Sequence, residues 1–160
     1  MKNLICVICF LFVSDVFGDT KVLDFLYEVR SDDSAASIRF KELNQNARNL
    51  DLEKALSEIE VITARTLEMS TLSRLNRAKA KCNVAIMKIA SGEYIGGLIE
   101  LEKSIEDFGD LVKPFDPAIL RALVVKGIAA LSVDDYQNSR NALRRAQHIL
   151  HREEGVFTLN

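Results

Sequence analysis

The sequence predicts an all-α protein of about three stacked helical pairs. Apolar residues recur at helical spacing along most of the chain, and no segment alternates long enough to predict a strand. A pattern also recurs at even spacing, as in Leu52, Tyr94 and Tyr136, with a period of about 42 residues. Such a period is typical of stacked repeats, in which each unit buries its apolar face against its neighbours.

Composition limits the class further. With 160 residues, 48% hydrophobic and 28% charged, the chain has the size and composition of one globular domain with a real core. Its two prolines and seven glycines suit a mostly helical chain. The formal net charge of −2 provides no basic excess for binding phosphates, so we expect no nucleic acid partner.

Residues 1–18 have the layout of a secretory signal peptide, with a cationic start, an apolar run over residues 4–13 and an expected cut at Gly18/Asp19. The alternative is a retained anchor. The apolar run, however, forms a helix of only about 15 Å, about half of a bilayer core. We therefore expect cleavage, no stable membrane span afterwards, and a secreted or periplasmic protein. Cys82 then remains as the only cysteine, and its place on an apolar stripe predicts a buried hydrophobe rather than a reactive thiol.

The elements follow in order. Residues 19–33 are predicted to contain an N-terminal helix that caps the stack, and residues 34–160 form the repeat domain. Gly92 and Gly155 are expected to end helices, while Asp116-Pro117 and Asp134 are expected to begin them. Gly96-Gly97 inside a helix indicates a close approach between helices. The expected helices cover about 34–48 and 51–68, 72–91 and 93–108, and 117–131 and 135–153.

Two of the three units resemble tetratricopeptide repeats. The residues that carry the resemblance are Gly92-Glu93-Tyr94 with Leu98 and Leu101, and then Leu123, Gly127, Ala130, Tyr136, Leu143 and Ala146. The first unit departs from the pattern with Leu52 for the aromatic residue, and Lys88 stands where a tyrosine is common. Each unit is also longer than the family's usual length of about 34 residues. The resemblance covers about residues 34–154. It implies a right-handed α-α superhelix of about three stacked antiparallel helical pairs. The first helix of each pair would line a concave groove that binds peptides or proteins without catalysis.

The repeat register then assigns a partner-binding site. Equivalent positions along the first helices are expected to face the groove, where basic and amide side chains beside isoleucines would suit an extended segment with an acidic group or free carboxylate. The alternative is that these are ordinary solvated or packing positions. The predicted partner-binding residues are Asn44, Arg48, Lys79, Ile86, Arg121 and Ile128.

The sequence shows no catalytic motif, so we expect no enzyme, no cofactor and no metal site. His148 and His151 are spaced like metal ligands, with Glu154 three residues on, but histidines near a helix C-terminus are also favoured by its dipole. Phe157 and Leu159 could fold back on the last helix or dock a second copy, so a homo-oligomer through the C-terminal end is left open. We expect a non-catalytic protein–protein interaction scaffold of the cell envelope; the alternative is a small helical domain that binds a small ligand or serves an enzyme as an accessory subunit.

Overall fold

The computed structural model describes residues 21–30, 34–49, 51–68, 73–112 and 116–157. Within these ranges it contains one 3-10 helix and six α-helices, and no strand, which confirms the all-helical class. The predicted signal peptide with its Gly18/Asp19 cut lies outside the described residues, as does Leu159. The elements are η1 (Lys21–Phe25), α2 (Ser34–Arg48), α3 (Leu52–Glu68), α4 (Arg74–Ala90), α5 (Tyr94–Gly109), α6 (Pro117–Ser132) and α7 (Tyr136–Phe157).

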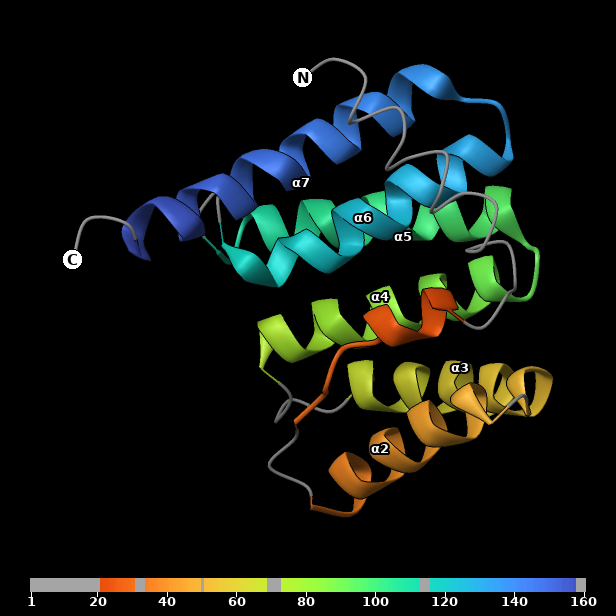
Figure 1. The fold of residues 1–160 in the computed structure, drawn as a ribbon. Coiled ribbons are helices and arrows are strands. Elements are labelled where there is room, and N and C mark those ends of the chain that lie inside the picture. The colour runs from red at the N-terminus through yellow and green to blue at the C-terminus, as the bar shows by residue number, and fades with distance from the viewer. Residues whose placement is uncertain (1–20, 31–33, 50, 69–72, 113–115, 158–160) are drawn as a thin grey trace.

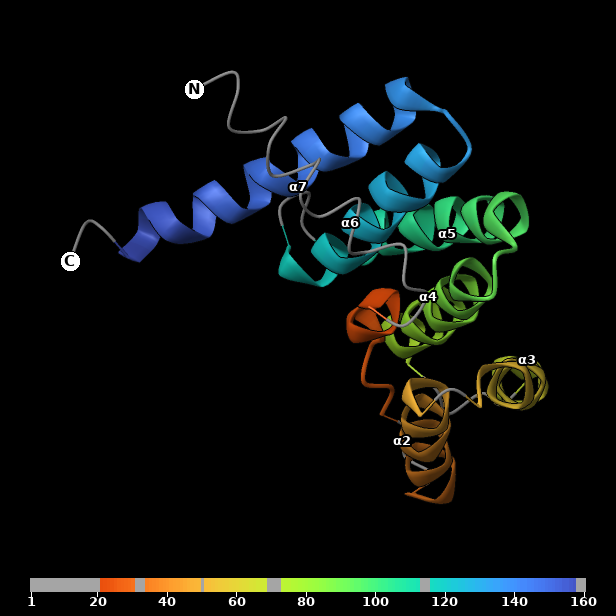
Figure 2. The ribbon, with the colours of Figure 1, turned by 45° about the vertical axis from the view of Figure 1, so that its right-hand side comes forward.

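Each α-helix packs against the next one in the chain, from α2 and α3 at one end to α6 and α7 at the other (Figure 1). The six predicted helices agree with these elements to within a few residues at most ends. The C-terminal part of α7 projects beyond the other helices (Figure 2). None of the described helices is both long and apolar enough to span a membrane.

Local sequence explains where α4 and α6 begin and end. Ser73 precedes α4, and its hydroxyl accepts a hydrogen bond from the Asn76 amide at 3.3 Å. Asp116 plays the same role before α6, where Pro117 occupies the first helical position. Gly92 follows α4 with a φ of +89°. The amides of Gly92 and Glu93 reach back to the α4 carbonyls at 3.1 and 2.9 Å, which is the hydrogen-bond pattern of a Schellman turn.

The α6–α7 turn differs from the prediction. Asp134, expected to begin the last helix, has a φ of +59° and instead terminates α6 with the hydrogen-bond pattern seen at Gly92. Asp135 is the residue whose carboxylate accepts the Asn138 amide of α7, at 3.1 Å. Gly155, expected to end α7, lies within it, because the helix continues to Phe157. A glycine disfavours a helix by only about 1 kcal/mol and does not by itself end one.

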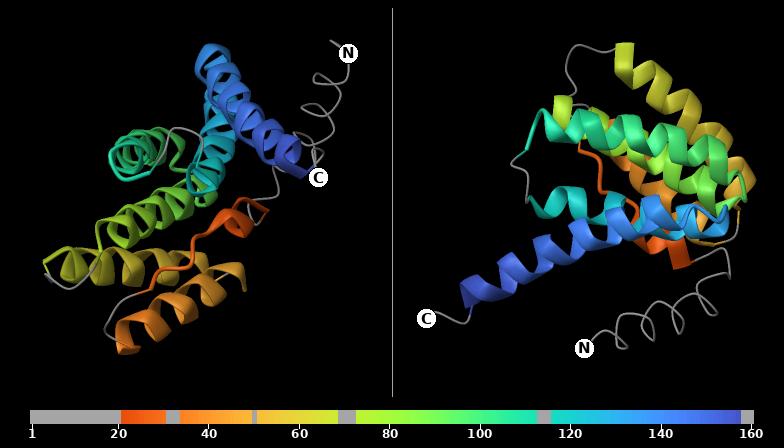
Figure 3. Two further views of the ribbon diagram at one scale, coloured as in Figure 1. Left: turned by 90° about the vertical axis from the view of Figure 1, so that its left-hand side faces the viewer. Right: turned by 90° about the horizontal axis from the view of Figure 1, so that it is seen from above.

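The largest departure concerns residues 19–33. The described part of this range, residues 21–30, is here called the N-terminal segment; it starts as the 3-10 helix η1 and continues without regular structure. It does not cap the end of the stack as predicted. η1 contacts α4 and also α2 and α6, the first helices of the three predicted pairs (Figures 1 and 3). The apolar side chains of the N-terminal segment belong to the main core. The buried ones are those of Val22, Leu23, Leu26, Tyr27 and Val29.

Ion pairs connect neighbouring helices at the edge of the core. Lys88 of α4 pairs with Glu60 of α3 at 3.0 Å and with Glu100 of α5 at 2.7 Å. The hydrogen bonds to Glu100 and Glu60 raise the pKa of Lys88 above its usual value. Lys88 therefore joins three successive helices, α3, α4 and α5, by charge.

Helices α4 and α5 approach closely at Gly97. A Cβ placed on Gly97 would lie 3.0 Å from the Ala85 carbonyl oxygen and 2.6 Å from the Ile89 side chain. The neighbouring Gly96 has nothing within 4 Å of such an atom. The predicted close approach is therefore correct for Gly97 and wrong for Gly96.

This contrast gives a matched test. We expect Gly97→Ala to lower the free energy of unfolding by about 1–3 kcal/mol, because the methyl group meets backbone atoms of α4. Gly96→Ala should raise it by about 0.5 kcal/mol through helix propensity alone. Urea unfolding followed by circular dichroism measures both changes. Equal effects of the two substitutions would contradict the close approach at Gly97.

Candidate functional site

Two buried asparagines hold the main chain of Tyr27. Asn83 of α4 accepts the Tyr27 N–H at 2.7 Å through Oδ1 and donates to the Tyr27 carbonyl at 2.9 Å through Nδ2. Asn44 of α2 donates to the same carbonyl at 3.0 Å. In addition, Arg121 of α6 donates to the Leu26 carbonyl at 2.8 Å. Side chains from three helices thus bind main-chain atoms of the N-terminal segment, in the way a receptor binds an extended peptide.

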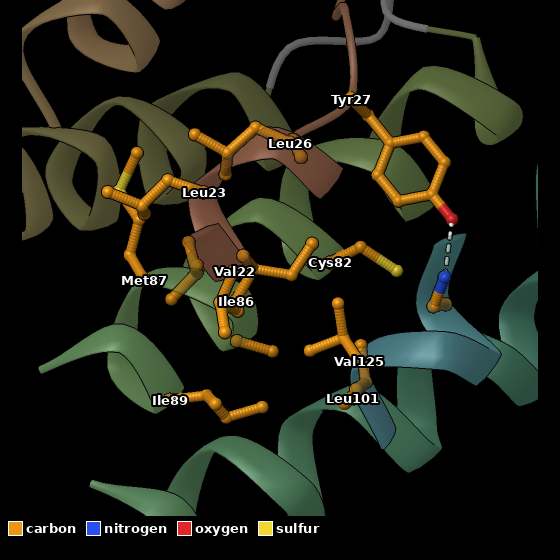
Figure 4. Packing of buried hydrophobic residues seen from close by; sticks show 14 of the residues in the cluster. Val22, Leu23, Leu26, Tyr27, Cys82, Ile86, Met87, Ile89, Leu101 and Val125 are labelled. Atoms are coloured by element: carbon orange, nitrogen blue, oxygen red, sulfur yellow. Dashed lines mark hydrogen bonds between the residues drawn. The ribbon is translucent and has the colours of Figure 1, made fainter. Parts of the chain in front are cut away.

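The Tyr27 side chain forms hydrogen bonds with two main-chain groups of α6. Its hydroxyl donates to the Ala118 carbonyl at 2.7 Å. It also accepts a hydrogen bond from the Ala122 amide at 3.0 Å (Figure 4). In a helix these two groups are partners of each other, so the phenol is placed in the hydrogen-bond ladder of α6. The ring lies 5.5 Å from Phe108, and the Arg121 guanidinium lies 5.7 Å from its centroid. Burial raises the pKa of Tyr27 far above its usual value.

Three of the predicted partner-binding residues meet at one place. Asn44, Arg48 and Arg121 line a single open pocket of about 420 Å³ between α2, α6 and the N-terminal segment. Lys79 lies on α4 and is half-buried. Ile86 is fully buried in the core and is not open to a partner in this arrangement, and Ile128 is partly buried.

The pocket has an unbalanced charge. Four cationic side chains line it, those of Arg30, Lys41, Arg48 and Arg121, against the single carboxylate of Glu28. That carboxylate already pairs with Arg30 at 3.2 Å, which lowers the pKa of Glu28. No acid among the described residues forms an ion pair with Lys41 or Arg48. The pocket can therefore attract a negatively charged group.

The remaining chemistry-bearing side chains form no reactive arrangement in the described part of the chain. Cys82 is buried, and desolvation raises the pKa of its thiol to about 12, so it is protonated and unreactive at neutral pH. No group of three His, Cys, Asp or Glu residues in the described ranges could hold a metal ion. His148 and His151 are exposed on α7, where His151 lies 3.3 Å from Gln147.

Comparison with protein-family models, curated proteins and solved structures finds no match for this chain. The resemblance to tetratricopeptide repeats therefore stays a prediction. What the chain binds has to be argued from its own geometry.

The sequence prediction missed Asn83 and Tyr27. One signal was present, since Asn83 interrupts an apolar stripe of α4 between Cys82 and Val84. A polar side chain on a buried face needs a hydrogen-bond partner. Sequence alone could not name that partner, because Tyr27 lies 56 residues away.

Asn83→Ala should lower the free energy of unfolding by about 1–3 kcal/mol, because it leaves the buried Tyr27 N–H without a partner. The matched control is Asn141→Ala on the exposed face of α7, which should stay within about 0.5 kcal/mol of the original chain. Chemical denaturation measures both. Amide exchange of Tyr27, read by NMR, should accelerate only in Asn83→Ala.

Burial of Cys82 predicts an alkaline loss of stability. The pKa of the Cys82 thiol is about 12 in the folded state and about 8.5 in the unfolded state. Above about pH 8.5 the unfolded chain therefore gains stability by losing the thiol proton, while the folded chain keeps it until the pH approaches 12. The free energy of unfolding is unaffected by this group below about pH 8.5 and falls as the pH rises towards 12. Between about pH 9 and 10 the free energy of unfolding should fall by about 1 kcal/mol per pH unit. Cys82→Ala should flatten this slope in urea titrations. An unchanged slope would contradict the assignment to Cys82.

Proposed function

We propose that the protein is a non-catalytic protein–protein interaction scaffold that binds an extended acidic peptide or protein segment. The observation that carries this proposal is the pocket beside Arg48, which has four lining cations, one already paired acid and an open shape. Guanidinium groups bind carboxylates through directed, charge-assisted hydrogen bonds. The Asn44 amide at the same pocket already binds a peptide carbonyl of the N-terminal segment.

The proposal includes a right-handed superhelix of three tetratricopeptide-like pairs. Its support is the similarity between the α4–α5 and α6–α7 joints. The positive-φ residues Gly92 and Asp134 end the first helix of each pair with the same hydrogen-bond pattern, and they lie one repeat period apart. Tyr94 and Tyr136 are separated by the same period, and each begins the helix that follows. In stacked repeats of this kind, the first helices form a continuous surface for a partner.

The proposed location is the cell envelope, where the protein would be secreted or periplasmic. The support is the sequence layout of residues 1–18, with its cationic start and apolar run. Partners are then expected among exported proteins or peptides.

The proposal predicts binding of an acidic peptide. The probe is a fluorescent octapeptide that alternates leucine and glutamate and ends in a free carboxylate, and its binding is followed by fluorescence anisotropy. Arg48→Glu should weaken binding at least about tenfold, because it replaces an attraction by a repulsion at the pocket. Binding should also weaken on raising the salt concentration from about 0.1 to 0.5 M, since salt screens exposed charges.

The matched control is Arg144→Glu, which makes the same charge change on the exposed face of α7 and should leave binding unchanged. Equal weakening by both substitutions would mean that only net charge matters. Glutarate alone, a small dicarboxylate, should not compete at millimolar concentration. If it competes as well as the peptide, the pocket is a small-ligand site and the scaffold proposal fails.

A further inference from the structure

The N-terminal segment is attached to the helices as a ligand would be. The groups that bind it belong to α2, α4 and α6, and the hydrogen bonds connect residues that are 17, 56, 91 and 95 positions apart. Covalently, residues 31–33 are its link to the repeat domain. Figure 3 shows the N-terminal segment beside α4, between α2 and α6.

The contacts with the main chain do not depend on the side chain of the bound residue. Asn83 binds both the N–H and the C=O of Tyr27, and Asn44 binds that same C=O, so any peptide residue with an extended main chain could satisfy them. Both asparagines are buried, and their amide groups need partners whenever this face is covered. The face thus contains preformed groups for a peptide backbone.

The side chains of the N-terminal segment provide the selectivity. The Tyr27 phenol satisfies a donor and an acceptor of α6, and a phenylalanine could not do so. Leu26 and Val29 are buried on either side of it, while Glu28 and Arg30 are exposed. The pattern that the face accepts is an aliphatic residue, a tyrosine, a free position and a second aliphatic residue.

We propose that the face formed by α2, α4 and α6 is a peptide-binding site that the N-terminal segment occupies in cis, and that its external ligand is an extended peptide with the pattern aliphatic–Tyr–x–aliphatic. This inference rests on the proposed scaffold function but concerns the adjoining buried face around Asn83, which shares Asn44 and Arg121 with the open pocket beside Arg48. The N-terminal segment competes with the external peptide and so raises the peptide concentration that is needed to occupy the site.

Tethering sets the scale of this competition. A segment joined by a short linker acts at an effective concentration on the order of 1 mM, so an equivalent peptide at about 10 μM would occupy only about 1% of the sites. Truncating one buried aromatic side chain weakens the binding of the N-terminal segment to its own site on the order of 100-fold. The occupancy of the site by the external peptide would then rise to about half. The test therefore requires a weakened N-terminal segment in the full chain.

The experiment measures binding of a fluorescein-labelled peptide with the sequence KVLDFLYEVR, that of residues 21–30, to the full chain by fluorescence anisotropy. Tyr27→Ala should bind it with an apparent Kd at least about 30-fold lower than the original chain does, since the cis competitor is weakened. Adding Asn83→Ala to this variant should abolish the gain. A peptide with alanine in place of its tyrosine should not bind.

The matched control is Ile149→Ala, which truncates a fully buried side chain of α7 without weakening the N-terminal segment. It should show no gain in peptide binding. If circular dichroism shows that Tyr27→Ala is unfolded, Leu26→Ala takes its place, with an expected gain of about tenfold.

Two results would overturn the inference: no gain in the variants with a weakened N-terminal segment, or an equal gain in Ile149→Ala, which would mean non-specific binding to a loosened core. The acidic octapeptide is measured in parallel. If it binds in an Arg48-dependent way while the tyrosine peptide does not, the scaffold function stands and the cis-occupied site does not exist.

Discussion

The structure depends on the pairing of two buried asparagine amides with the main-chain N–H and C=O of one residue, Tyr27. Asn83 is fully buried among apolar neighbours, and a buried amide without partners costs about 1–3 kcal/mol for each unmet group. The main-chain N–H and C=O of Tyr27 are the partners of the Asn83 Oδ1 and Nδ2 atoms, and the same C=O is also the partner of the Asn44 Nδ2. The apolar side chains of the N-terminal segment would cover these helices in many registers. The asparagines fix where the main chain lies but accept any residue there. The register is selected by the Tyr27 hydroxyl, which alone can bond both the Ala118 carbonyl and the Ala122 amide of α6.

The helices could be predicted because their signals are local. Asp116-Pro117 and Gly92 act through the hydrogen-bonding needs and backbone angles of their own turn, and the structure confirms both. Asp134 was assigned to the wrong helix, because an aspartate can serve either as an N-cap or as a left-handed residue after a helix. The position of the N-terminal segment was not predictable, since its periodicity indicates an apolar face but not which helices that face meets.

The candidate site was predictable in part for the same reason. The repeat register identified Asn44, Arg48 and Arg121 as residues facing a common space, and they line one pocket. The register could not foresee that the chain itself covers the adjoining face. It therefore assigned Ile86 to a partner although it is buried in the core. The two regions differ in charge pairing. Lys81, Lys88 and Lys126 pair with acids of neighbouring helices. Among the residues that the structure describes, no acid forms an ion pair with Lys41 or Arg48.

The span of the Tyr27 contacts has a consequence for biosynthesis. Residues 21–30 are made early, but the Ala122 amide that donates to the Tyr27 hydroxyl lies 95 positions after Tyr27. At about 5–20 residues per second, on the order of ten seconds pass between the synthesis of the two partners. During that interval the leucines and valines of the N-terminal segment cannot reach their final environment, so they stay open to contacts with a chaperone or with other chains. That period cannot end before α6 has been made.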